Sequence, residues 1–161
     1  MREPELIART DALQVSYAAA LDSRDMARWL GCFAAEASYI CTHRESDEQG
    51  LKLALMMDDC AERLRDRAKF ITEVWAGTFE DYWTRHFIQR LDHRIRDDGL
   101  LEVTSNFSVF YTTADGRSSV LAVGRYEDEV IATDSDDGAK FRSRRAIIDT
   151  STLPRYLVYP L

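Results

Sequence analysis

Leu101–Thr113 has the sequence LEVTSNFSVFYTT, in which apolar and polar side chains alternate. Successive side chains of a β-strand point to opposite faces, so this alternation predicts a strand with one covered and one solvated face. The covered face would carry Leu101, Val103, Phe107, Val109 and Tyr111. The solvated face would carry Glu102, Thr104, Asn106 and Ser108.

The same alternation recurs on both sides of this segment, with turn residues in between. The further alternating segments are Phe87–Ile95, Ser118–Thr133 and Ala139–Thr150. Stretches that contain Asp and Gly separate them, at 97–99, 115–116 and 134–138. Both residue types tolerate the positive φ of hairpin turns, so we expect a long antiparallel meander.

The first third of the chain has a helical pattern instead. Apolar side chains recur every three or four residues between Leu6 and Leu21, and a second short helix would follow Asp25 as its N-cap. A strand is predicted at 37–42, a strand or a helix at 51–57, and a helix at 60–71. Helices followed by consecutive strands are typical of an α+β domain. We expect a single domain over residues 1–161, with the N-terminal helices across the concave side of the sheet.

Composition excludes several classes of protein. A chain of 161 residues fits one domain, and 21 basic against 28 acidic residues give a net charge of −7, which disfavours binding to nucleic acid. Three irregularly spaced cysteines fit a reducing compartment. The first residues lack the apolar core of a signal peptide, and no window approaches the length of a membrane span. We therefore expect a cytoplasmic protein that does not bind a membrane.

The few possible metal ligands do not form a complete site. Cys41-Thr-His43 has the C-x-H spacing of half a Rieske site, but no C-x-x-H follows Cys60. His86 and His93 are seven residues apart, and on a regular strand this odd spacing points them to opposite faces. We expect no metal and no cofactor site in this chain.

A polar and aromatic set could line a pocket: Tyr17, Asp22, Trp29, Tyr39 and His86. Aspartate, tyrosine and histidine can transfer protons, whereas large aromatic side chains more often serve packing. We expect aromatic side chains to fill the interior. An open pocket with His86 within hydrogen-bond distance of Asp22 would instead favour an enzyme.

The last residues suggest an interface. Arg144, Arg145 and Asp149 lie on the last predicted strand, and arginine suits interfaces because its guanidinium makes paired hydrogen bonds with carboxylates. The apolar tail after Pro154 either folds over its own sheet or contacts a partner. Its candidate interface residues are Tyr156, Tyr159 and Leu161. We expect self-association through the sheet and this tail.

The order and spacing of residues along the whole chain resemble those of a known family. The residues that carry the resemblance, in chain order, are Asp22, Asp25, Trp29, Phe33, Tyr39, Arg44-Glu45, Asp58-Asp59, Leu64–Arg67, Arg85-His86, Gly124-x-Tyr126, Arg142, Arg145, Asp149 and Pro160-Leu161. The chain resembles the small (β) subunit of bacterial aromatic-ring-hydroxylating dioxygenases, in the cone-shaped group that includes ketosteroid isomerase and scytalone dehydratase. It departs from that family between Trp75 and Trp83.

The resemblance implies a cone-shaped α+β fold with a strongly curved mixed or antiparallel sheet. It also implies a non-catalytic structural subunit, which forms trimers and joins a large (α) subunit in an α3β3 assembly. The Rieske 2Fe–2S cluster and the mononuclear iron would belong to that large subunit. NADH or NADPH would supply electrons through a reductase, often with a ferredoxin. The alternatives are a free-standing dehydratase or isomerase that uses the pocket set, or a small-ligand binding protein.

Overall fold

The computed structural model describes residues 2–133 and 138–161. The helices are α1 (Glu3–Asp22), α2 (Met26–Gly31), α3 (Arg44–Glu48), α4 (Ala61–Lys69) and a π-helix η1 (Phe70–Val74). The strands are β1 (Phe33–His43), β2 (Met56–Asp58), β3 (Tyr82–Ile95), β4 (Leu101–Thr113), β5 (Ser118–Ala132) and β6 (Ala139–Ile148). The turn predicted at 134–138 lies outside the described residues except for Gly138.

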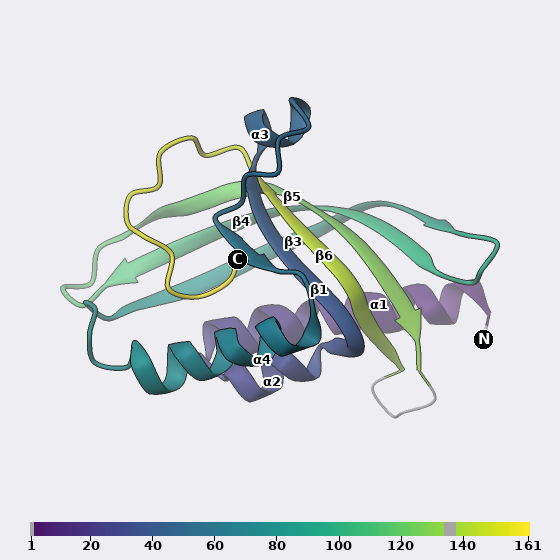
Figure 1. Ribbon diagram of the computed structural model, residues 1–161, viewed down its shortest axis with the longest axis horizontal. Helices are drawn as coiled ribbons and strands as arrows, with labels where there is room; N and C mark the ends of the chain where they lie inside the picture. Colours follow the sequence, from purple (N-terminus) through teal and green to yellow (C-terminus); the bar gives the residue numbers. More distant parts are fainter. Residues whose placement is uncertain (1, 134–137) are drawn as a thin grey trace.

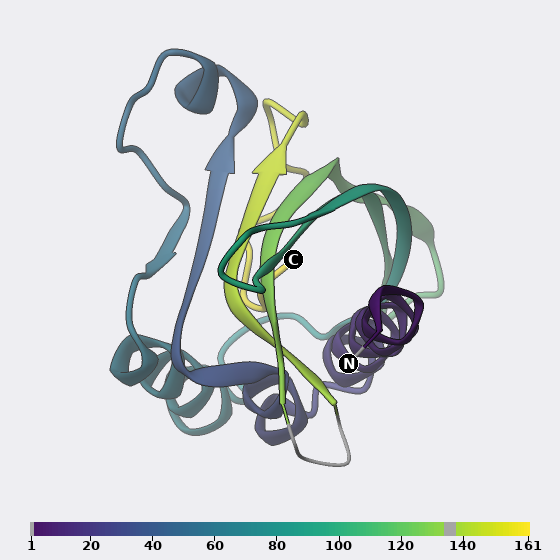
Figure 2. The same cartoon turned by 90° about the vertical axis from the view of Figure 1, so that its right-hand side faces the viewer.

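One six-stranded sheet forms the body of the protein, in the order β2-β1-β6-β5-β4-β3. The β1–β6 pair is parallel and the other pairs are antiparallel, so the sheet is mixed. The sheet curls from β1 round to β3, and α1, α2 and α4 lie across its open, concave side (Figure 1, Figure 2). The predicted α+β class and the placement of the helices are confirmed.

The strands follow the alternation in the sequence. β4 has the predicted bounds, and Leu101, Val103, Phe107 and Val109 are buried along it. β3 begins at Tyr82, five residues before the predicted start. The ambiguous 51–57 segment has no regular secondary structure until the short β2 begins at Met56. The helix predicted at 60–71 ends as the π-helix η1.

At Gly124 the backbones of β5 and β6 approach closely. A Cβ atom at this position would lie 2.1 Å from the carbonyl oxygen of Ile147 and 2.9 Å from the Cα of Ile148. Glycine is therefore required here, since any side chain would force the two strands apart.

None of the helices in the described part of the chain has the length and apolar character needed to cross a bilayer.

Candidate functional site

Tyr17, Trp29 and Tyr39 lie inside the cone and are fully buried. Trp29 contacts Phe33 and Tyr39 edge to face, with ring centroids 5.0 Å and 6.2 Å apart. Tyr17 contacts Phe33 in the same manner, at 6.2 Å. These rings fill the space between helices and sheet, so the prediction that they are packed in the interior is confirmed.

Arg144 lies at the centre of this interior, with no exposed surface. It donates from Nε and Nη2 to the two carboxylate oxygens of Asp128, at 2.8 Å and 2.7 Å, and also to Gln14. Its guanidinium carbon lies 3.9 to 4.1 Å from the ring centroids of Tyr17, Tyr126 and Phe141. The prediction that Arg144 serves an interface is wrong, because its side chain faces the concave side and is enclosed by its own chain.

Gln14 is the indication of this buried pair in the sequence. Gln14 falls on the buried stripe of α1 beside Thr10 and Tyr17, where apolar side chains are the norm. A long polar side chain at such a position needs a buried partner. Asp128 is that partner, with its Oδ2 3.0 Å from Gln14 Nε2.

The buried hydroxyl and thiol groups in the interior have raised pKa values. Burial raises the pKa of Tyr17, although the nearby Arg144 opposes the effect, and burial also raises the pKa values of Tyr39 and Tyr126 well above their ordinary value. Burial raises the pKa of Cys41 to about 12. These groups stay protonated near neutral pH, so none of them is an activated nucleophile or base.

The C-terminal tail folds back into the same interior. Tyr17 and Tyr39 donate their hydroxyls to the carbonyl oxygen of Leu161, at 2.6 Å and 3.2 Å, and the amide of Leu161 donates to Tyr39 Oη at 2.9 Å. Val158 and Leu161 are buried, whereas Tyr156 is 59% exposed. Of the two alternatives for the tail, packing on its own domain is the one observed. Leu161 is thus unavailable to a partner, and its interface assignment is wrong.

Asp22 and His86 form a second group, where α1 ends beside β3. The carboxylate Oδ1 lies 2.6 Å from His86 Nδ1 and accepts from the hydroxyl of Thr84 at 3.0 Å, and Oδ2 accepts the amide of His86 at 3.1 Å. Burial alone would raise the pKa of Asp22, but the hydrogen bonds from His86 and Thr84 outweigh it. The pKa of this carboxyl therefore lies below its ordinary value.

A groove of about 520 Å³ between α1 and β3 includes this pair in its lining. Asp11 and Arg90 also line it and are joined by two hydrogen bonds of 2.8 Å and 3.0 Å. The side chain of His86 is only 1% exposed, and its Nε2 is buried. A molecule in the groove would therefore meet Asp22 and apolar side chains before the imidazole.

The two histidines of β3 contact the same helix. His86 contacts Asp22 at one end of α1, and His93 Nε2 lies 3.3 Å from Glu3 at the other. The prediction of opposite faces is wrong, because the pairing of β3 with β4 is irregular between Arg90 and Asp92 and the alternation shifts by one residue. The ends of α1 are about 28 Å apart at 1.5 Å per residue, so the two rings cannot share an ion.

The half Rieske pattern does not become a metal site in the structure. Cys41 is fully buried in the core, and burial raises the pKa of its thiol to about 12. Among the described residues, no group of three or more His, Cys, Asp or Glu side chains is placed to hold a metal ion. An iron–sulfur cluster therefore does not fit these residues.

Arg145 and Asp149 face outward, and their side chains are 38% and 35% exposed. Arg145 pairs with Asp47 and with Glu127, the latter at 2.5 Å, and Asp149 pairs with Arg44 at 2.5 Å. The Arg145–Asp47 and Arg44–Asp149 pairs join α3 to β6 and the residue that follows it. A role for these two residues at an interface stays a prediction.

Comparison with known proteins places the chain in one group. Residues 17–155 match the family model described as ring hydroxylating beta subunit. The small subunit of anthranilate 1,2-dioxygenase from Burkholderia cepacia is 30% identical over 149 residues, which are 92% of this chain and 90% of that protein.

Solved structures of other proteins share the fold. One, from Novosphingobium aromaticivorans, is proposed to be the β subunit of an aromatic-ring-hydroxylating dioxygenase; it has a TM-score of 0.80 and 24% identity, over 97% of each chain. Another is the β subunit of benzoate 1,2-dioxygenase from Burkholderia mallei, with a TM-score of 0.70 and 20% identity over 88% of this chain and 89% of that one.

Proposed function

The chain belongs to the family of ring-hydroxylating dioxygenase β subunits, and we propose that its part in the enzyme is structural rather than catalytic. It is the small subunit of an aromatic-ring-hydroxylating dioxygenase, an oxidoreductase of aromatic catabolism, and a β subunit implies a large α subunit as its partner. The observation that carries this conclusion is the family match over residues 17–155 together with 30% identity to a dioxygenase small subunit.

In this proposal the large subunit holds the Rieske 2Fe–2S cluster and the mononuclear iron and attacks the aromatic ring. NADH or NADPH supplies the electrons through a reductase, with or without a ferredoxin, in the cytoplasm. The residues of the small subunit support this division of labour, because its interior is packed with neutral phenols, a protonated thiol and a buried Arg144–Asp128 ion pair. Such a core supplies rigidity.

We also propose that the chain forms trimers within an α3β3 assembly. An apolar patch on the outer face of the sheet supports self-association, and we call it the sheet patch. It consists of Trp83, Phe87, Phe110, Val120 and Val123, which are 37 to 61% exposed. Phe87 and Phe110 pack edge to face across β3 and β4, with centroids 5.7 Å apart. A lone copy would leave this patch in water.

The proposal is tested first on the genome and then by co-expression. A neighbouring reading frame should encode a large subunit with C-x-H and C-x-x-H motifs, and the two chains should purify together in equal amounts. Iron should be found with the large subunit and not with the small subunit alone. One or two iron atoms per isolated small subunit, or failure of the two chains to associate, would contradict the proposal.

A second candidate function, proton transfer in a free-standing dehydratase or isomerase, is favoured by the 2.6 Å contact between Asp22 and His86. Against it, both carboxylate oxygens are already hydrogen-bonded and the imidazole is covered. Binding of phenol to the isolated chain, followed through the imidazole signals of His86 by NMR, distinguishes the candidates. A saturable shift that Asp22→Asn abolishes would support the enzyme or a small-ligand binding protein, and unchanged signals would support the structural subunit.

A further inference from the structure

Leu161 is held inside the cone by contacts that would equally hold a bound peptide. Tyr17 and Tyr39 donate their hydroxyls to its carbonyl oxygen, and the hydroxyl of Tyr39 also accepts its amide. Both polar groups of the backbone of one residue are thus recognised by buried phenols. The side chain of that residue is enclosed as well, since Leu161 is 1% exposed.

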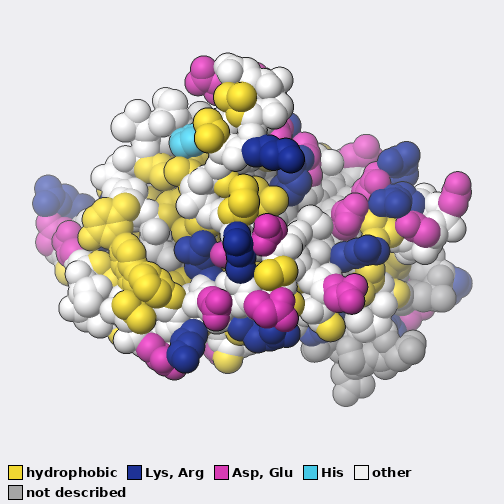
Figure 3. All heavy atoms as spheres, in the orientation of Figure 1, with side chains coloured by type: hydrophobic (Ala, Val, Ile, Leu, Met, Phe, Trp, Pro, Cys, Tyr) yellow, Lys and Arg dark blue, Asp and Glu magenta, His cyan; other side chains and the backbone are white. Residues whose placement is uncertain are grey.

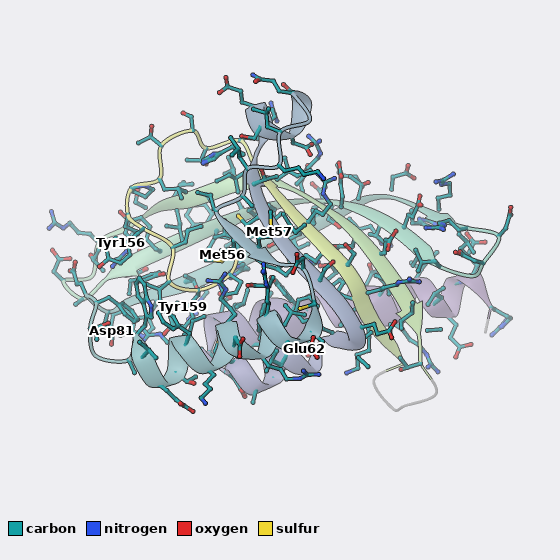
Figure 4. The ribbon with its side chains drawn as sticks, viewed as in Figure 1. Met56, Met57, Glu62, Asp81, Tyr156 and Tyr159 are labelled. Atoms are coloured by element: carbon teal, nitrogen blue, oxygen red, sulfur yellow. The ribbon has the colours of Figure 1, made fainter. Side chains whose placement is uncertain are left out.

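The tail that carries Leu161 leads from the surface into this interior. Residues 150–161 contain no helix or strand, and Ser151 and Thr152 are exposed. The tail crosses the left half of the face in Figure 3, where hydrophobic side chains gather. Figure 4 shows Tyr156 on the outer part of the tail and Tyr159 closer to α4, so the chain turns inward between them. The end of the tail can therefore leave the interior without breaking the sheet.

An anchor precedes the inward turn. Arg155 donates from Nη2 to the carbonyl oxygen of Glu80 at 2.9 Å, and its guanidinium carbon lies 3.9 Å from the ring centroid of Tyr82. This contact holds the tail to the start of β3. Movement of the tail out of the interior would then involve only residues 156–161.

The interior around Leu161 also contains polar atoms that the tail does not satisfy. Tyr126 Oη and Arg144 Nη1 are buried and have no hydrogen-bond partner among the described residues. The ring centroid of Tyr126 lies 6.3 Å from that of Tyr17, and the guanidinium carbon of Arg144 lies 4.1 Å from it. Both therefore stand beside one of the two phenols that hold Leu161. Buried polar groups are normally hydrogen-bonded, so these two indicate a site whose best occupant has a further acceptor.

We propose that the interior of the cone is a binding site for a short apolar peptide, and that the tail is its exchangeable occupant. The ligand would supply the amide, the carbonyl and the branched side chain of a leucine-like residue, together with an acceptor for Tyr126 or Arg144. The site is separate from the groove that contains Asp22 and His86, because neither Tyr17 nor Tyr39 lines that groove. Every contact in it lies within this chain, so it does not depend on the large subunit.

The tether explains why the site is closed in the intact chain. A tethered occupant acts at an effective concentration on the order of millimolar, so a free peptide competes poorly with it. Cutting the tether turns the tail into an ordinary ligand, whose affinity can be measured.

The test cuts the tail in the folded, full-length chain. A protease site is placed between the exposed Ser151 and Thr152, so cleavage leaves the segment 152–161 bound but no longer tethered. A labelled synthetic 152–161 peptide is added, and its exchange into the cut protein is followed by fluorescence anisotropy. Calorimetry of the same sample records whether the protein stays folded.

Matched variants separate recognition of Leu161 from general stickiness. Leu161→Asp in the peptide should raise its Kd at least tenfold, whereas Thr152→Asp, the same change at an exposed position, should not alter it. In the protein, Tyr39→Phe removes two of the three hydrogen bonds to Leu161 and should also raise the Kd. Tyr111→Phe is its control, because the hydroxyl of Tyr111 is not among those that bind Leu161.

A small probe tests the chemistry of the site. N-acetyl-leucinamide should displace the peptide at a concentration at least tenfold below that of N-acetyl-alaninamide, since each additional buried carbon changes affinity about fourfold. The proposal is overturned if the cut segment does not exchange, if the cut protein unfolds and excess peptide does not restore the fold, or if the Leu161→Asp peptide binds like the unchanged one. Each of these results would mean that the tail is a fixed part of the core.

Discussion

Replacing Arg144 with Met should be among the most damaging single changes in this protein. The substitution keeps a long side chain but removes the charge that Asp128 faces at 2.7 and 2.8 Å. Both side chains of this pair have zero exposure, so water cannot compensate for the loss. Asp128 would then be a buried, charged carboxylate whose remaining hydrogen bond is the one from Gln14 Nε2, at 3.0 Å.

The size of the effect follows from the burial. Removing one partner of a buried ion pair costs about 3–5 kcal/mol of the free energy of unfolding. For a chain of this length each kcal/mol lowers the melting temperature by about 2–4 °C, so the expected decrease is roughly 6–20 °C. Arg145→Met on the same strand is the matched control, because that side chain is 38% exposed and its ion pairs contribute about 0–1 kcal/mol.

The assay is urea denaturation of both variants, followed by circular dichroism and compared with a double variant. Arg144→Met with Asp128→Leu removes both charges and should recover most of the lost stability, since a buried pair can often be replaced by apolar side chains at little net cost. Equal losses for Arg144→Met and Arg145→Met would refute the reasoning, as would a loss below about 1 kcal/mol for Arg144→Met.

Four further predictions concern the core, the strands, acid stability and iron. Deleting residues 156–161 should lower the melting temperature in calorimetry, because the tail is hydrogen-bonded inside the core. A loss of self-association with an unchanged melting temperature would contradict this. Gly124→Ala should destabilise the sheet, since its Cβ would lie 2.1 Å from the carbonyl oxygen of Ile147, whereas Gly31→Ala, with nothing within 4 Å, should not. Folding lowers the pKa of Asp22, so the ionised carboxylate stabilises the fold fully above its ordinary pKa near 4, and this stabilisation is lost as the pH falls through the folded pKa. Below about pH 5 the urea midpoint of Asp22→Asn should therefore depend less on pH than that of the wild type. Elemental analysis of the isolated chain should find no stoichiometric iron, and bound iron would contradict this. As a single domain, the chain should also unfold in one calorimetric transition rather than two.

Much of the fold was predictable from the sequence because its signals are local. The alternation in Leu101–Thr113 specifies the bounds of β4, and the helical stripe from Leu6 to Leu21 specifies α1. Each pattern reflects the geometry of a single element, with a period of two for strands and 3.6 for helices. The burial of Tyr17, Trp29 and Tyr39 follows from the same stripes.

The candidate site could not be assembled in this way. His93 shares a face with His86 because the pairing of β3 with β4 shifts register between Arg90 and Asp92, and no residue type there predicts such a shift. Arg144 and Arg145 are adjacent and chemically identical, yet one is enclosed by three aromatic rings and the other faces solvent. Which of the two arginines faces the interior depends on the register of β6 with β5 and on where the helices pack.

Local periodicity and turn residues were therefore enough to determine the fold class of this protein, and the family followed from the resemblance of its motifs to known small subunits. Only the tertiary structure decided that the tail is hydrogen-bonded to Tyr17 and Tyr39, and that Asp22 meets His86. These contacts join residues 64 to 144 positions apart. Local sequence patterns carry no information on such pairs, because chain closure and packing select them from many partners of similar chemistry.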